Sequence, residues 1–329
     1  MTEWTKDKEK KVLWKYRFTL TLRIVRVLAT IFLIYVIYNA ALNFIYHQSE
    51  GGFKHAANAK LATEWKYPAV DVDFFNEMPE ISPVLTQHIS FDLKRKLGKE
   101  DQVVGSVEVD KSFFPIFSQW KIEYIQPKDQ NPFPFYLPED PRTGDATTFL
   151  PSDETWNRLE QVHEGTVADL GFSLKDYVAP EELVTRLEGY DLDIRWMPIY
   201  SGELQEFESS YGASGGALSV DAIGMGQLYG LDRDDFQSWG SMSFSKDSIK
   251  DHEQEMLSNM QAIIEEGEGY YKNFLGMPYL NERHDYLAEN GFQVYGAVVT
   301  GPVKELLKLK QDELIHGASL GEMDYWNWE

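Results

Sequence analysis

The most constraining feature of this sequence is an uncharged apolar run of 19 residues near its start, Val27 to Ile45. At a rise of about 1.5 Å per residue, a helix of this length spans about 28 Å, close to the roughly 30 Å hydrocarbon core of a bilayer. A cleaved signal peptide has a shorter apolar region of about 7–15 residues, and the small-residue site Ala57-Asn58-Ala59 lies too far downstream. A buried core helix is seldom apolar on every side over such a length. The run therefore predicts a retained transmembrane helix at residues 27–46.

Charge is distributed unevenly around this run. Between Met1 and Arg26 eight basic residues stand against three acidic ones, which gives +5, whereas the whole chain of 329 residues carries −22. The remainder is therefore at −27. Because positive flanks stay in the cytoplasm, we expect a cytoplasmic basic tail (1–26), a single pass through the cell membrane and an extracytoplasmic C-terminal domain. The lipid bilayer is thus one partner, and a body of this acidity excludes nucleic acid as another.

Residue types limit the chemistry that the chain can carry. The absence of cysteine excludes disulfides, thiolate nucleophiles, zinc–thiolate sites and iron–sulfur clusters. His163-Glu164 lacks the second histidine of a zinc-binding helix, and the acidic loop from Asp232 to Asp235 lacks the spacing of a calcium loop. We therefore expect no metal and no cofactor.

Beyond the membrane, a proline-rich stretch divides the sequence in two. Residues 47–126 are predicted to form a stalk and a β-rich module: Gly51–Tyr67 reads as a linker with a helical stalk, and alternating apolar residues follow, typical of half-buried strands. Leu97 to Asp101 is predicted as a hairpin turn between two of them. Six of the fourteen prolines fall within 127–151, and proline fixes φ and removes a donor, so this stretch is predicted as a linker.

Residues 152–329 alternate between strand and helix patterns. Strands are predicted at Ala168–Leu174 and Leu192–Trp196, the latter with Leu192, Ile194 and Trp196 on one face. A helix should begin at Pro180 and stop at Gly189, and an amphipathic helix should cover Ile249–Ile264.

The end of the chain contains the most buried pattern. Phe292–Val299 is apolar on both faces, which predicts a central strand, followed by a turn at Thr300-Gly301-Pro302 and a helix. The aromatic tail Tyr325–Trp328 is predicted as a last strand. The expected fold class is α+β: a single transmembrane signal-anchor helix followed by an extracytoplasmic mixed α/β domain in one or two lobes.

Two short segments are candidate sites. Gly212–Gly216 fits the G-x-S-x-G pattern of a hydrolase nucleophile, but no buried strand precedes Ser214 and glycines follow it, so a glycine-rich loop without catalysis is predicted. Thr300, Gly301 and Lys304 lead from a strand into a helix, whose free N–H groups and positive dipole end favour an anion or ligand. Ordinary helix capping explains the same residues, so both interpretations stay open.

Two separated motifs resemble a known family. The segments His163–Gly202 and Val294–Lys310 resemble the C-terminal domain of the sigma-factor-regulator family of Firmicute membrane proteins. The basic leader, the single span and the alternating segment after it are similar to the family's N-terminal module. The resemblance implies a membrane-anchored, anti-sigma-factor-like or accessory regulator of an extracytoplasmic-function sigma factor in a stress response.

The partner that this resemblance implies is a sigma factor, reached directly or indirectly. Anti-sigma factors of this architecture carry a sigma-binding domain ahead of the span, whereas about 26 residues precede it here, too few for a core. We therefore expect a second membrane subunit or anti-sigma partner, with Asn39 and Asn43 as a helix contact in the membrane. Two alternatives stay open: an extracytoplasmic ligand- or protein-binding module with no sigma-factor role, and a membrane-anchored hydrolase.

Overall fold

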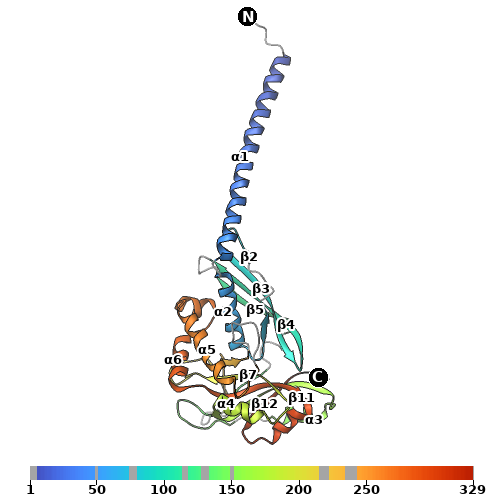
Figure 1. Cartoon of the computed structure of the whole chain (residues 1–329), viewed down its shortest axis with the longest axis vertical. Coiled ribbons are helices and arrows are strands. Elements are labelled where there is room, and N and C mark those ends of the chain that lie inside the picture. Colours follow the sequence, from blue (N-terminus) through green and yellow to red (C-terminus); the bar gives the residue numbers. More distant parts are fainter. Residues whose placement is uncertain are drawn as a thin grey trace.

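The structure is a computed structural model that describes residues 6–48, 51–73, 80–112, 118–126, 133–148, 152–214, 222–233 and 243–328. A long N-terminal helix projects from a body in which two main sheets are packed with helices (Figure 1). This arrangement confirms the predicted α+β class with one apolar helix ahead of a sheet-rich domain.

Helix α1 (Lys6–Gln48) is 43 residues long and contains the predicted span. Its most apolar window has a mean hydropathy of 2.2, and none of that window is buried inside the body. A helix with so many exposed large apolar side chains would be unfavourable in water, because none of these side chains would gain the free energy of burial. The predicted apolar helix is therefore confirmed, and its length and composition suit a bilayer crossing.

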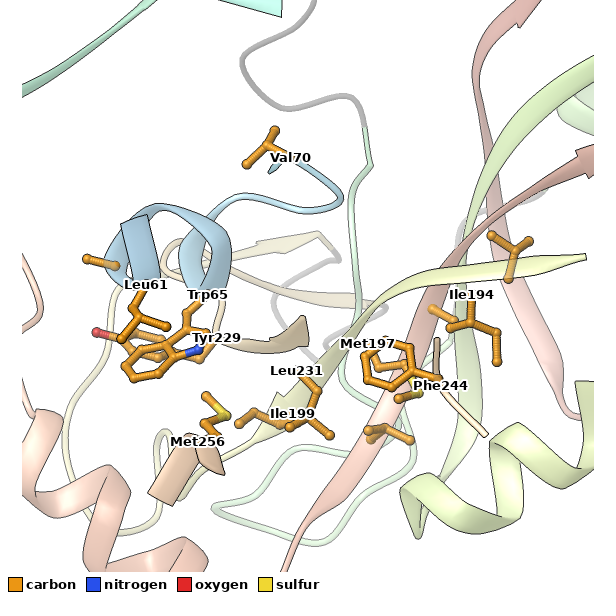
Figure 2. Packing of buried hydrophobic residues seen from close by; sticks show 14 of the residues in the cluster. Leu61, Trp65, Val70, Ile194, Met197, Ile199, Tyr229, Leu231, Phe244 and Met256 are labelled. Carbon is orange, nitrogen blue, oxygen red and sulfur yellow. The ribbon is translucent and has the colours of Figure 1, made fainter. Parts of the chain in front are cut away.

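Helix α2 (Gly51–Lys66) confirms the predicted helix, but it is buried in the body, so the prediction that it forms a stalk is wrong. Ala56, Ala59, Ala62 and Trp65 are fully buried, and Figure 2 shows Trp65 beside Tyr229, the residue before β10 of the large sheet. The alanines let the helix approach the sheet closely, while Trp65 fills the remaining space. Alanine is small and only weakly apolar, so an alanine-rich helix shows no clear apolar face in its sequence and its burial cannot be predicted from that pattern.

The membrane-proximal sheet is antiparallel throughout, with strand order β1-β3-β4-β5 and β2 paired to β3. Its strands are β1 (Asp71–Asp73), β2 (Glu80–Ile81), β3 (Thr86–Leu97), β4 (Glu100–Ser112) and β5 (Gln119–Tyr124). Strands β3 and β4 form a hairpin whose two-residue turn is Gly98-Lys99, with Gly98 at φ 62°. Glycine takes this left-handed conformation without steric cost, and the predicted hairpin turn is confirmed.

The large sheet has the order β10-β7-β11-β6-β12, again with only antiparallel neighbours. Its strands are β6 (Thr166–Val178), β7 (Asp193–Tyr200), β10 (Gly230–Asp232), β11 (Gln293–Pro302) and β12 (Ile315–Tyr325). Strand β11 is central, as predicted. The predicted turn at Thr300–Pro302 is wrong, because these residues continue β11 and pair with Asp169, Ala168 and Val167 of β6.

Helices cover the large sheet and close the core. They are α3 (Asp153–Gln161), α4 (Pro180–Leu187), α5 (Ile249–Ile264), a π-helical turn (Gly269–Phe274), α6 (Leu280–Asn290), α7 (Val303–Leu306) and a 3₁₀ turn (Leu307–Gln311). The predicted helices at Pro180 and at Ile249–Ile264 are confirmed. Met256 of α5 packs near Leu61 and Trp65 of α2 in the same apolar cluster (Figure 2).

Strand β7 contains a bulge that changes which residues share a face. Val298 of β11 pairs with Trp196, but the next residue, Val299, pairs with Ile194. The extra residue moves Trp196 to the opposite face from Ile194, and the two side chains fall in separate apolar clusters. The prediction that Leu192, Ile194 and Trp196 face one way is therefore wrong, because it assumed an uninterrupted period of two.

Three segments between the regular elements differ from simple loops. Tyr211–Ser214 forms β8, paired with β9 (Ala222–Met225), so the predicted glycine-rich loop is wrong for the three residues Gly212–Ser214, while Gly215 and Gly216 lie outside the described residues. In residues 133–148 no regular helix or strand is present, yet Phe133, Phe135 and Leu137 are buried. The aromatic tail belongs to β12 only at Tyr325; Trp326–Trp328 lie beyond the strand.

Candidate functional site

The tip of the β3–β4 hairpin is held by the large sheet. The backbone N–H of Gly98 donates to the Thr300 hydroxyl oxygen of β11 at 2.9 Å, and Thr300 is fully buried. A Cβ atom at Gly98 would lie 1.9 Å from Oδ1 of Asn327, so any other residue at this position would displace the Asn327 side chain. The turn residue thus serves two purposes, a left-handed φ and a close approach.

The C-terminal tail closes over the same hairpin tip. Nδ2 of Asn327 donates to the Leu97 carbonyl at 3.0 Å, and Oδ1 of Asn327 accepts from the Lys99 N–H at 3.3 Å. The Lys99 ammonium lies 4.2 Å from the ring centroid of Trp328, a cation–π contact. We call these contacts of Gly98 and Lys99 with Thr300, Asn327 and Trp328 the hairpin-tip interface.

An ionic cluster of Asp71, Asp193, Arg195 and Arg233 joins the two sheets nearby. Arg195 of β7 is nearly fully buried and donates through Nη2 to Oδ2 of Asp71 in β1 at 2.6 Å. Oδ2 of Asp193 lies 3.7 Å from Nη1 of Arg195 and 3.3 Å from Nη1 of Arg233. Breaking one buried pair leaves its partner charge uncompensated, which typically costs about 3–5 kcal/mol. The cluster therefore fixes how the membrane-proximal sheet sits on the large one.

Asp169 of β6 is 1% exposed, and the charge of Arg195 in this cluster acts on it. Burial raises the pKa of its carboxyl to about 7, because the charged form is poorly solvated; the Thr300 hydroxyl, Arg95 and Arg195 lower it only in part. With a pKa of about 7, the Asp169 carboxyl is partly protonated near neutral pH.

A cavity of about 370 Å³ opens on another side of the body, beside the end of α2. Its residues are Lys66, Tyr67, Pro68 and Met225 to Leu228. Burial lowers the pKa of Lys66 to about 7, and its amine donates to the carbonyls of Leu275 and Gly276 at 2.9 and 3.1 Å. The Lys66 amine is therefore used in hydrogen bonds to the backbone at Leu275 and Gly276 and is not a free cation for a ligand in the cavity.

The candidate anion residues do not form an open site. Thr300 and Gly301 are buried in β11, where a Cβ at Gly301 would lie 2.6 Å from Leu192. Lys304 is exposed, but α7 is only four residues long and has little dipole to offer. An anion contact at these residues stays a prediction, whereas the role of Thr300 in the hairpin-tip interface follows from its hydrogen bond.

The other candidate residues lie apart from the interface. Asn39 and Asn43 occupy one face of α1, and their amides donate to the carbonyls of Tyr35 and Asn39, four residues back, at 2.8 and 2.9 Å. Ser214 ends β8. Among the described residues no group of three histidines or carboxylates could hold a metal ion.

Sequence reasoning missed every member of the ionic cluster. Asp193 and Arg195 alternate with apolar residues, so they read as the solvent face of a strand. Strand β7 is buried on both faces, so Arg195 faces another sheet instead of water. The pattern Asp-Ile-Arg-Trp offers no signal that separates these two situations.

Comparisons with known proteins agree with the architecture. Two family models match the chain, sigma factor regulator N-terminal over residues 10–102 and sigma factor regulator C-terminal over residues 159–322. A Bacillus subtilis (strain 168) protein described as probable anti-sigma-M factor YhdL is 22% identical over 284 residues, which cover 86% of this chain and 72% of that protein. No solved structure matches the chain.

The two matched regions fall on distinct parts of the structure. The N-terminal match covers most of α1, all of α2, β1 to β3 and the start of β4, and the C-terminal match covers β6, β7, β10, β11 and most of β12 of the large sheet. Regulators of this kind interact with a sigma factor and are generally not enzymes. The described residues contain one helix long and apolar enough to cross a membrane, which agrees with a single-pass membrane protein. The chain belongs to the sigma-factor-regulator family, as a membrane-anchored regulator of a sigma factor.

Proposed function

We propose that the body of the chain lies outside the cytoplasm and regulates an extracytoplasmic-function sigma factor in a stress response. The charge distribution supports this orientation: the described residues from Lys6 to Arg26 form an exposed basic stretch of α1, while the chain after Arg26 carries −27. Basic flanks are retained in the cytoplasm, and acidic bodies can be translocated. The relative described as probable anti-sigma-M factor makes a sigma factor of that kind the first candidate.

The observation that carries the proposal is the position of α2. It begins three residues after the end of α1, and its buried face contacts the strands of both sheets. Trp196 of the large sheet donates its indole N–H to the Glu64 carbonyl of α2 at 3.0 Å. A change in the tilt or position of α1 would therefore move α2, which contacts both sheets, and so would change the body. Regulation across a bilayer requires such a difference between two states of the protein.

We infer that the sigma factor is held with the help of a second membrane subunit or a fuller anti-sigma partner. The side chains of α1 from Lys6 to Arg26 are all exposed and pack against no other described element. A lone basic helix has no core of its own and suits an anionic lipid surface at least as well as a protein. Within the membrane, Asn39 and Asn43 keep their amide oxygens available to a partner helix, worth roughly 1–2 kcal/mol at most for each contact.

Orientation is tested with alkaline phosphatase, which is active only outside the cytoplasm. A fusion after Trp328 should be active, and a fusion that replaces everything after Arg26 should be inactive. The opposite pattern would refute the proposed orientation.

The partner is tested by capture from detergent-solubilised membranes. Full-length chain should retain the sigma factor together with another membrane protein, and a peptide of residues 1–26 should retain none. The double variant Asn39→Leu, Asn43→Leu should weaken capture of the membrane protein, while Thr19→Leu, Thr30→Leu, on the same helix, serves as the matched control. Retention of the sigma factor by the peptide alone at micromolar concentration would show direct binding and overturn the indirect model.

A further inference from the structure

The turn between β2 and β3 has an apolar tip. Val84 is 73% exposed and Leu85 is 42% exposed, and the sequence carries no charge from Ile81 to Gln87. Turns that face water are normally built from glycine, asparagine, aspartate and serine. Two adjacent exposed apolar side chains at a turn tip indicate a contact surface more than a solvated loop.

Leu85 also adopts an unfavourable backbone conformation. Its φ is 60°, in the left-handed region where glycine or asparagine avoids the clash between Cβ and the backbone. A leucine that is kept in this conformation while 42% of it is exposed is not fully explained by packing within the body. Strained positions of this kind often coincide with functional contacts.

The apolar tip lies against the membrane helix. The Tyr38 hydroxyl of α1 donates to the Pro83 carbonyl at 2.9 Å, and Figure 1 shows β2 beside the lower part of α1. Tyr38 stands seven residues before Ile45, the last residue of the apolar run. The tip is therefore level with the outer part of the membrane-spanning sequence.

A bilayer that ended before Tyr38 would leave the tip in water, but the charges of α1 argue against it. A hydrocarbon core of about 20 residues that ended at Tyr38 would begin near Thr19. Arg23 and Arg26 would then lie inside it, and ionised side chains within the hydrocarbon are strongly unfavourable. Placing the core after Arg26 keeps both charges at the inner boundary. The tip, at the level of Tyr38, then lies about 10 Å along the helix from the outer end of the apolar run at Ile45, within reach of the acyl chains.

The backbone of the turn is suited to a less polar medium. The N–H of Leu85 donates to the Ser82 carbonyl at 3.0 Å, and the N–H of Ser82 donates to the Thr86 carbonyl at 2.9 Å. Pro83 has no N–H, and Tyr38 satisfies its carbonyl. A segment that leaves bulk water must satisfy its polar backbone groups internally, and this turn largely does so.

From these observations we propose that the Ser82–Leu85 turn is a second membrane contact of the chain. It inserts into the interfacial layer of the leaflet nearest the body, with Val84 and Leu85 directed to the acyl chains. Interfacial segments bury their apolar side chains about 5–10 Å into the boundary between headgroups and acyl chains. The occupant of this surface is lipid, and the contact is independent of which side of the membrane the body faces.

The chain has no cysteine, so a single introduced cysteine carries a unique label. Val84→Cys is labelled with the environment-sensitive dye NBD in the full-length chain, reconstituted into phosphatidylcholine–phosphatidylglycerol liposomes. The matched control is Val103→Cys, also an exposed valine, at 47% exposure. Val103 pairs with Lys94, eight residues along β3 from Thr86, and so lies about 27 Å further from the turn.

The dye at Val84→Cys should emit at a shorter wavelength than at Val103→Cys, and nitroxide-labelled lipids should quench it several-fold more strongly. Pro83→Cys is a second probe of the same turn, for use if the melting temperature of Val84→Cys falls below that of the wild type. It should give the same emission and quenching as Val84→Cys. Equal emission and equal quenching at the turn and at Val103 would overturn the proposal. A blue shift without quenching by the lipids would also overturn it, because the turn would then contact protein.

Discussion

The protonation of Asp169 should control the stability of the body near neutral pH, and Asp169→Asn tests this directly. The carboxyl is 1% exposed, and its burial raises its pKa to about 7 from an ordinary value of 3.8. Asparagine keeps the size of the side chain and carries no charge at any pH. The variant therefore removes the proton equilibrium while it leaves the packing of β6 largely unchanged.

The sign follows from the direction of the pKa shift. Because the folded state binds this proton more tightly than the unfolded state, its contribution to stability is fully present below about pH 4 and is lost as the pH rises to about 7. A shift of about three pKa units corresponds to at most about 4 kcal/mol, at about 1.4 kcal/mol for each unit. Relative to wild type, Asp169→Asn should therefore gain up to about 4 kcal/mol between pH 4 and pH 8.

The assay is urea unfolding of the full-length chain in detergent micelles, followed by tryptophan fluorescence and repeated across this pH range. Asp145→Asn removes a carboxylate from an exposed turn and serves as the control for general charge effects. The stability difference between wild type and Asp169→Asn should change with pH, while that for Asp145→Asn should stay nearly constant. A difference for Asp169→Asn that is flat from pH 4 to pH 8 would refute the reasoning about burial.

Three further substitutions test separate parts of the structure. Trp196→Ala should cost about 3–5 kcal/mol of unfolding free energy, since the indole is fully buried and hydrogen-bonded, and a loss below about 1 kcal/mol would contradict its place in the core. Asn327→Ala should accelerate hydrogen exchange at the Lys99 amide by up to about tenfold, and unchanged exchange would show that the tail does not hold the hairpin tip. Ser214→Ala should leave sigma-factor regulation intact, whereas labelling of Ser214 by a fluorophosphonate would revive a hydrolase.

Local signals in the sequence were sufficient for several elements. Pro180 at the first helical position and glycine after the last turn defined α4, and the uniform apolarity of Phe292–Val299 placed β11 at the centre of its sheet. The turn at Gly98-Lys99 followed from a short polar break between two alternating segments. Each of these features is determined by residues within a few positions of one another.

Features that depend on distant residues could not be predicted in this way. The burial of α2 depends on a sheet that the chain forms about a hundred residues later, and the alanines of α2 do not indicate that the helix packs against a sheet. The bulge in β7 appears only in its pairing with β11, so the face of Trp196 could not be read from alternation. The ionic cluster needs three strands at once, and a single strand cannot show whether its arginine faces water or another sheet.

The β3–β4 hairpin joins the two ends of the body. One end of β3, at Thr86, adjoins the turn that Tyr38 of α1 contacts, and the other end, at Leu97, is held by Asn327 and the large sheet. The strand is twelve residues long, about 40 Å, and is paired to β4 along its whole length.

Such a paired strand resists bending, and it runs alongside the separate connection through α2. With one attachment, the body could rotate about the junction of α1 and α2 and absorb any change in the membrane helix. With two attachments that rotation is blocked. We infer that a change in the tilt of α1 must instead displace the hairpin against the large sheet, where the ionic cluster of Asp71, Asp193, Arg195 and Arg233 lies. Buried charged interfaces favour one arrangement over its neighbours, because a displaced ion pair loses its compensation, and that property suits an element that has to report a small movement.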